Sequence, residues 1–144
     1  MALDISQHAS TDPDFALCFE IRLKVFVHEQ NVKLAEERDD YDATGLHFLA
    51  RVDGVPAGTA RVLMHHGDIK ITRVAVLREF RGQRIGGALM RHIETEFPAR
   101  RYVLDGQIQA RHFYARLGYA PQGDVFMEAG IPHIRMAKDA TARL

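Results

Sequence analysis

The sequence has one cysteine, no tryptophan and no net charge in its 144 residues. Because the single cysteine, Cys18, has no second cysteine to pair with, no intrachain disulfide forms and an oxidising compartment is not required. The 19 basic side chains balance the 19 acidic ones, whereas a protein that neutralises several nucleic-acid phosphates usually carries a basic excess. The composition therefore argues against nucleic acid as a partner.

Long apolar runs are missing as well. No stretch of about 18 apolar residues occurs, and residues 1–8 lack the basic and apolar regions of a secretory signal. We therefore expect a cytoplasmic protein with no membrane partner. Apolar residues make up 47% and charged residues 26% of the chain, which is the balance of an ordinary globular protein. One domain over residues 1–144, with a core that needs no covalent staple, is expected.

Hydrophobic periodicity predicts helices and strands in a mixed order. Helices are expected at about 12–27, where Asp12 and Pro13 would begin the helix, at Ile85–Phe97 and at Ile108–Leu117. Strands are expected at Leu3–His8, Leu46–Val52, Ala57–His65, Ile69–Leu77 and Tyr102–Leu104, with two more after Tyr119. Asp53-Gly54 predicts a hairpin turn. The pattern indicates an α/β protein with a mixed sheet.

An acidic stretch, Asn31–Asp42, lacks a clear apolar face. It is expected to form a short helix or a loop whose carboxylates lie mostly on a solvated face. Attraction of a cationic acceptor is the functional alternative.

A glycine-containing turn, Arg81–Ala88, connects the third strand of the expected meander to a helix. Amides at the start of a helix have no intrahelical partner, so such a turn attracts anions. Gly82, Gly86 and Gly87 would let a phosphate approach the backbone, although the same glycines also suit a turn that only packs closely. The spacing fits neither a dinucleotide fingerprint nor a P-loop.

Four segments carry a family resemblance. Arg81–Gly86 resembles the acetyl-CoA motif Q/R-x-x-G-x-G/A of the GNAT acyltransferases, with Arg84 in place of the first glycine. Gln107–Tyr119 is similar to the family's segment N-x-x-A-x-x-x-Y-x-x-x-G-F. Val25–Gln30 and Glu128–Met136 resemble the ElaA/YjcF-like branch. Together these segments span nearly the whole chain.

This resemblance implies the GNAT fold, a mixed and mostly antiparallel twisted sheet with helices on both faces, splayed to admit pantetheine. It also implies transfer of an acetyl group from acetyl-CoA, the co-substrate, to the primary amine of a small molecule or peptide, by direct attack in a ternary complex. A catalytically silent acyl-CoA-binding or protein-interaction module with the same fold is the alternative. A homodimer is left open.

The resemblance also assigns roles to residues. Tyr114 would protonate the departing CoA thiolate, although its place on an apolar helical stripe also suits core packing. A backbone N–H of the strand Arg73–Val76 would stabilise the developing negative charge. Glu29, Glu128 and His133 are candidates for the general base, with a water chain as the alternative. The residues expected to hold acetyl-CoA are Val74, Ala75, Val76, Arg81, Gly82, Gln83, Arg84, Gly86, Gly87, Gln107 and Phe113.

The eight histidines raise the question of a metal site. His65 and His66 are adjacent, and His28-Glu29 lacks a second histidine four residues after the first. The spacing therefore predicts no metal, and Cys18 is expected to be a small core residue.

Overall fold

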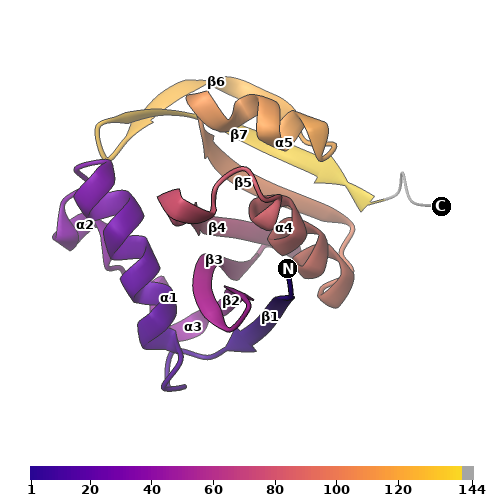
Figure 1. Cartoon of the computed structure of the whole chain (residues 1–144). Helices are drawn as coiled ribbons and strands as arrows, with labels where there is room; N and C mark the ends of the chain where they lie inside the picture. The colour runs from indigo at the N-terminus through magenta and orange to yellow at the C-terminus, as the bar shows by residue number, and fades with distance from the viewer. Residues whose placement is uncertain (141–144) are drawn as a thin grey trace.

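Seven strands form one sheet in the order β1-β2-β3-β4-β5-β7-β6 in the computed structural model, which describes residues 1–140 (Figure 1). The strands are β1 (Leu3–His8), β2 (Leu46–Val52), β3 (Val55–His65), β4 (Asp68–Val76), β5 (Arg101–Gln107), β6 (Ala120–Glu128) and β7 (Ile131–Asp139). The α-helices are α1 (Phe15–Arg22), α2 (Leu34–Glu37), α3 (Tyr41–Thr44), α4 (Ile85–Glu96) and α5 (Arg111–Arg116). A π-helical segment, η1 (Leu23–Glu29), continues α1, and two 3-10 segments, η2 (Arg78–Phe80) and η3 (Ile108–Ala110), precede α4 and α5.

The antiparallel meander β1–β4 places one helix on each face. Phe48 and Ala50 of β2 belong to the core on the α4 side, whereas Leu49 packs with Cys18 of α1 on the other. This alternation is the period-two pattern that the sequence shows. The hairpin between β2 and β3 turns at Asp53 and Gly54, with φ angles of 50° and 84°, as that dipeptide predicts.

Helix α4 packs against the sheet and holds the turn that precedes it in place. It buries Ile85, Leu89, Met90 and Ile93, and each such side chain contributes roughly 1.5–3 kcal/mol relative to exposure. Gly58 of β3 lies under the helix, since a Cβ there would be 3.2 Å from Ile85 Cγ2. The start of α4 is therefore held close to the end of β4.

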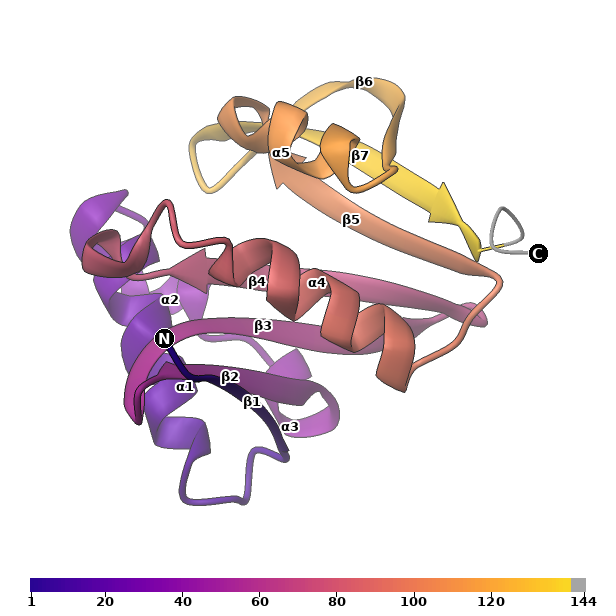
Figure 2. The same ribbon diagram turned by 45° about the vertical axis from the view of Figure 1, so that its right-hand side comes forward.

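The sheet splits between β4 and β5. These parallel strands pair only at Ile69 with Tyr102 and Lys70 with Val103, after which their ribbons diverge (Figure 2). The Tyr102 hydroxyl donates to the carbonyl of Phe97 at 2.8 Å, which anchors β5 at the closed end of the split. Strand β5 continues into its own antiparallel layer with β7 and β6.

Two sequence predictions need correction in the first third of the chain. The regular helix begins at Phe15 rather than at Asp12. Residues 12–14 form a turn that leads into it, in which Asp12 Oδ1 accepts a hydrogen bond from the N–H of Asp14 at 2.9 Å and the Asp12 carbonyl accepts one from the N–H of Phe15 at 3.0 Å. The acidic stretch is not mainly a solvated face. Glu37 is 3% exposed, and Asp39 and Asp42 are ion-paired with arginines.

Candidate active site

A cleft of about 1040 Å³ opens where β4 and β5 stop pairing. Of the predicted site residues, its lining includes Val74, Ala75, Val76, Arg81, Gln107, Tyr114, Glu128 and His133. The others, Glu29, Gly82, Gln83, Arg84, Gly86, Gly87 and Phe113, lie outside that lining, on η1, in and just after the turn that Arg81 begins, and on α5. The fold thus places around one space the predicted acid, two candidate bases and the strand that is predicted to stabilise the developing negative charge.

Strand β4 carries a bulge at the wall of this cleft. Thr59 of β3 pairs with Ala75, but Arg61 pairs with Thr72, so Arg73 and Val74 together lie opposite one residue of β3. Arg73 takes a left-handed backbone conformation with φ of 55°. A bulge bends its strand and redirects the groups around it, and here it lies beyond the last pair that β4 makes with β5.

The turn between β4 and α4 presents free backbone amides. From Gly82 to Gly87, no backbone N–H donates a hydrogen bond to another residue in the described part of the chain; the first to do so is Ala88, to the carbonyl of Arg84 at 3.1 Å. These amides lie at the head of a 12-residue helix, whose dipole favours negative charge. The Arg84 side chain is exposed beside them.

The geometry of the turn explains its glycines individually. Gly82 has φ of 83°, and Arg84, where the family motif has glycine, has φ of 63°. Arg84 therefore holds a left-handed conformation that costs a residue with a side chain roughly 1–2 kcal/mol. Gly86 instead serves packing, since a Cβ there would lie 3.1 Å from Cζ of Phe113 on α5.

Arg81 and Glu29 form a two-pronged ion pair at the end of η1. The two terminal guanidinium nitrogens of Arg81 lie 2.6 and 2.7 Å from the two Glu29 carboxylate oxygens, while its Nε donates to the carbonyl of Val76 at 3.0 Å. The hydrogen bonds from Arg81 lower the pKa of Glu29. Glu29 is therefore a weak proton acceptor in this structure, and Arg81 braces the turn against the end of β4.

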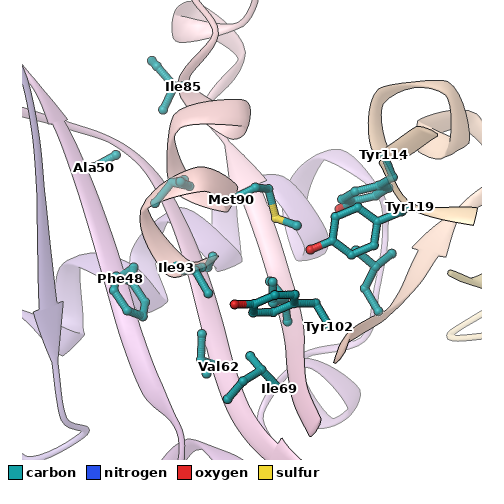
Figure 3. Close-up of a cluster of buried hydrophobic side chains, with 14 of the residues drawn as sticks. Phe48, Ala50, Val62, Ile69, Ile85, Met90, Ile93, Tyr102, Tyr114 and Tyr119 are labelled. Atoms are coloured by element: carbon teal, nitrogen blue, oxygen red, sulfur yellow. The ribbon is translucent and has the colours of Figure 1, made fainter. Parts of the chain in front are cut away.

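Tyr114 is buried at the cleft wall with 8% of its surface exposed. Its ring packs against Phe113 and Tyr119. The three tyrosines of this core, Tyr102, Tyr114 and Tyr119, lie on one side of Met90 of α4 (Figure 3). Burial raises the pKa of Tyr114 to about 12. Its hydroxyl makes no hydrogen bond within residues 1–140, so it keeps its proton at neutral pH and can donate it.

Two further features place Tyr114 and Gln107 at the mouth of the split. Gly106 of β5 gives the Tyr114 ring room, because a Cβ there would lie 3.1 Å from Cδ2 and Cε2 of that ring. Gln107, the next residue, donates from Nε2 to Oε1 of Gln30 at 2.8 Å, and Gln30 donates back at 3.3 Å. This amide pair connects the end of η1 to the end of β5.

His133 on β7 lies across from Gln107 on β5. Its Nδ1 is 2.7 Å from the carbonyl oxygen of Ile131. Because a carbonyl only accepts, Nδ1 carries hydrogen and the neutral ring keeps its lone pair on Nε2. Nε2 is 3.7 Å from Glu128 Oε2, and the ring stacks on Phe126 with centroids 5.9 Å apart.

A network of buried charges backs the cleft. Arg22, which is 1% exposed, donates to Glu37 and Asp42, each at 2.7 Å. Arg61 donates to Asp39 and Asp42 at 2.6 and 2.8 Å. These pairs bind α2 and α3 to α1 and β3, which is why the acidic stretch turns inward.

One cluster of potential metal ligands lies away from the cleft, and the sequence spacing gave no sign of it. Ligand atoms of His8, Asp12 and Asp14 lie within 4.8 Å of one another. His8 already has hydrogen-bond partners at both ring nitrogens, in Ser6 and Asp12, and Arg51 supplies a cation to Asp14 at 3.0 Å. The described contacts account for this cluster as a hydrogen-bonded network.

Sequence reasoning passed over several residues that the structure brings to the cleft. Gln30 lies in a segment that carries the resemblance, so its proximity to the site was within reach. Glu37 had no such signal, because its burial arises from contacts distant in sequence. Arg73 lies in the strand that the resemblance singled out, but its positive φ had no signal in the sequence. Within residues 1–140, every helix is too short or too polar to cross a membrane.

The split sheet, the amide-bearing turn before α4 and the lined cleft together define the acyl-CoA N-acyltransferase fold. An acyl-CoA N-acyltransferase from Pseudomonas aeruginosa has this fold with a TM-score of 0.83 and 28% identity, over 95% of this chain and 99% of that one. The crystal structure of Escherichia coli ElaA matches with a TM-score of 0.82 and 26% identity, over 96% and 100%.

Sequence comparison gives the family. The model described as "Acetyltransferase (GNAT) domain" matches residues 7–140. The uncharacterized N-acetyltransferase YjcF of Bacillus subtilis is 36% identical over 125 residues, which cover 84% of this chain and 89% of YjcF. The chain belongs to the GNAT acetyltransferase family, and the expected resemblance to the ElaA/YjcF-like branch is confirmed. It is an acetyl-CoA-dependent N-acetyltransferase.

Proposed function

We propose that this acetyltransferase moves an acetyl group from acetyl-CoA to a primary amine by direct attack, within the cleft between β4 and β5. The amine nitrogen forms a bond to the thioester carbonyl carbon, the carbon–sulfur bond breaks, and CoA leaves as a thiolate that takes up a proton. The observation that carries the proposal is one cleft lined by both the bulged strand β4 and the buried Tyr114.

The turn after β4 would hold the diphosphate of the donor. Its support is the run of amides from Gly82 to Gly87 without partners among the described residues, at a helix N-terminus that favours anions. Arg84 adds an exposed positive charge, whereas Arg81 is already paired with Glu29. The phosphate contacts would therefore come mainly from backbone amides, with Arg84 as the nearby cation.

The pantetheine arm would run between the diverging strands. The edge of β4 that faces β5 has no strand partner beyond Lys70, so its backbone groups suit the amides of pantetheine. Gln107 would exchange its hydrogen bond with the Gln30 amide for a hydrogen bond with an amide of pantetheine. The thioester oxygen would lie at a backbone N–H of the bulged segment Arg73–Val76, and one such donor is worth about 10²–10³ in rate.

Tyr114 would protonate the leaving thiolate. Three observations support this role: the raised pKa keeps the phenol protonated, the hydroxyl makes no hydrogen bond within the described residues, and the residue lines the cleft. The ring also packs in the core, so core packing and acid catalysis are compatible here.

His133 is the base that the geometry favours. Its hydrogen bond to Ile131 leaves Nε2 with a lone pair, and the ring lines the same cleft as Tyr114. Glu29 is disfavoured because Arg81 occupies both of its carboxylate oxygens. Glu128, beside His133 Nε2, would orient the ring or stabilise its protonated form.

Release of free CoA thiol from acetyl-CoA tests this function directly, with a panel of small amines and lysine-containing peptides as acceptors. We expect thiol release that depends on one of the amines. We also expect double-reciprocal plots of rate against substrate concentration to intersect when both substrates are varied. Parallel plots would indicate an acetylated enzyme and contradict direct attack. Tight CoA binding without release for any amine would support the silent binding module instead.

A further inference from the structure

We propose that Glu37 is a positioning residue for acetyl transfer: it holds Arg73 at the β4 bulge and so fixes the direction of the backbone N–H groups there. The inference rests on the proposed function, which assigns the thioester oxygen to a donor in this segment. It concerns a buried carboxylate on α2 that does not itself need to touch either substrate.

Arg73 has an unusual backbone and a heavily restrained side chain. Its φ of 55° is one that residues with a Cβ rarely adopt outside special sites. Its Nε is ion-paired with Glu37 Oε1 at 3.1 Å but makes no hydrogen bond among the described residues. Its terminal nitrogen donates to Asp39 Oδ2 at 3.1 Å and to the Glu37 carbonyl at 3.3 Å. The strained bulge is thus tied to α2 and to the residues just after it.

Glu37 is itself fixed, so it is a firm anchor for the bulge. It is 3% exposed, its Oε1 accepts from Arg22 Nε at 2.7 Å, and its carbonyl accepts from Arg22 at 2.9 Å. Arg22 is 1% exposed and belongs to α1, which packs on the sheet. A contiguous chain of charged contacts therefore runs from α1 through Glu37 to Arg73.

The bulge makes this anchor matter for the reaction. Arg73 and Val74 line the cleft, and the β5 side of β4 has no strand pairing there to hold the backbone. The register with β3 keeps the bulge in place, but without the side-chain tie less holds the positive φ of Arg73. A change in that angle would turn the N–H groups of the segment away. A displacement near 1 Å in a catalytic group costs about 10²-fold in rate.

A matched pair of variants tests the proposal. Glu37→Gln keeps the shape of the side chain and removes the charge that attracts Arg73. Asp42→Asn weakens the same buried network at Arg22 and Arg61, but Asp42 makes no ion pair with Arg73 among the described residues. We expect kcat to fall roughly 10- to 100-fold in Glu37→Gln with unchanged CoA affinity, while Asp42→Asn lowers the melting temperature and keeps kcat.

An Arg73→Gly background supplies a second test, since glycine adopts positive φ without strain. In that background Glu37→Gln should cause no further loss of kcat. Three results would each overturn the positioning role. They are a loss of kcat of roughly 10- to 100-fold from Glu37→Gln in the Arg73→Gly background, an unchanged kcat in Glu37→Gln alone, and an equal loss of kcat in Asp42→Asn.

Amide hydrogen exchange at Arg73, Val74 and Ala75 provides a readout without substrate. Exchange should become faster in Glu37→Gln and stay unchanged in Asp42→Asn; unchanged exchange in both variants would overturn the proposal. If the wild-type protein acetylates no amine, the proposed function fails, and this measurement still decides whether Glu37 holds the bulge.

Discussion

Tyr114 combines a packing role in the core with the acid role that we propose for it. The ring can lie against β5 because Gly106 has no Cβ. Burial of the ring raises the pKa of the phenol to about 12. A buried tyrosine with a high pKa is poor as a base but remains a proton donor at neutral pH. The same burial that builds the core therefore keeps the phenol protonated for the acid role that we propose.

We predict that Tyr114→Phe lowers kcat about 10²-fold or more while the dissociation constant for CoA changes little. Phenylalanine keeps the ring and its packing but has no proton to give. Steady-state kinetics with a responsive amine, alongside calorimetric titration with CoA, measures both quantities. Unchanged kcat would remove Tyr114 from the acid role.

The competing bases can be separated in the same way. His133→Ala should reduce kcat/KM by about 10²-fold or more, because it removes the free Nε2. Glu29→Gln should have a much smaller effect, since Gln still hydrogen-bonds to Arg81 and Glu29 already has a lowered pKa. The comparison is made at equal saturation with acetyl-CoA, and a larger loss in Glu29→Gln would reverse the assignment.

Among the elements, the position of the turn from Arg81 to Ala88 could be predicted from the sequence, whereas the contacts of its side chains could not. Its position between a strand and a helix was readable from the change of period. The sequence could not show that Gly86 is needed for Phe113 packing or that Arg81 is bound by Glu29, because both partners lie far away along the chain. A substitution at Gly86 would therefore disturb packing as well as the phosphate binding that we propose.

Gln83 offers a cleaner probe of the turn, because it is exposed and is not among the residues with positive φ. Gln83→Glu should weaken CoA binding several-fold and Gln83→Lys should strengthen it, since the diphosphate is an anion near the substituted side chain. Both effects should shrink at high salt, and neither variant should change the melting temperature. Equal affinities in the two variants at low salt would contradict a phosphate site at this turn.

Whether the remaining elements could be predicted depends on whether local or long-range interactions determine them. The hairpin at Asp53-Gly54 was predictable because its turn chemistry is local. The helix start at Asp12 was predicted too early, because residues 12–14 form a turn before the regular helix begins at Phe15. The inward-facing acids were predicted wrongly because their partners, Arg22, Arg61 and Arg73, come from other elements. The β4 bulge has no local signal, since arginine is not a residue that marks positive φ.

At the scale of the whole molecule, buried charges between α1, α2, α3 and the sheet connect stability to pH. His47 is 1% exposed and its Nε2 lies 3.0 Å from the Asp42 carbonyl. Burial lowers the pKa of His47 below its ordinary value of 6.5. As the pH falls below about 6.5, the unfolded chain therefore binds a proton at His47 that the folded protein does not yet bind. The free energy of unfolding decreases as a result.

We expect the free energy of unfolding of the wild type to decrease more between pH 7.5 and pH 5.5 than that of His47→Gln. The difference is limited to about 1.4 kcal/mol per pH unit, the value for one proton. Burial raises the pKa of Glu37, which acts in the opposite direction but is common to both proteins. Urea unfolding at the two pH values measures the difference, and parallel losses would show that His47 is not the group responsible.

The two halves of the sheet together line the cleft in which we place the reaction. The meander with α4 supplies the turn and the bulge, whereas β5, α5 and β7 supply Gln107, Tyr114 and His133. The halves pair through only two residue pairs of β4 and β5, so the cleft exists because the sheet is split. The central claim is that acetyl-CoA lies in this split, with its diphosphate at the turn and its acetyl end at Tyr114.

A crystal structure of the protein with bound acetyl-CoA tests that claim most directly. We predict diphosphate oxygens within hydrogen-bond distance of the amides between Gly82 and Gly87, pantetheine along the free edge of β4, and the thioester sulfur next to the Tyr114 hydroxyl. A donor bound elsewhere, or a sulfur atom remote from Tyr114 with the diphosphate away from the turn, would contradict the account.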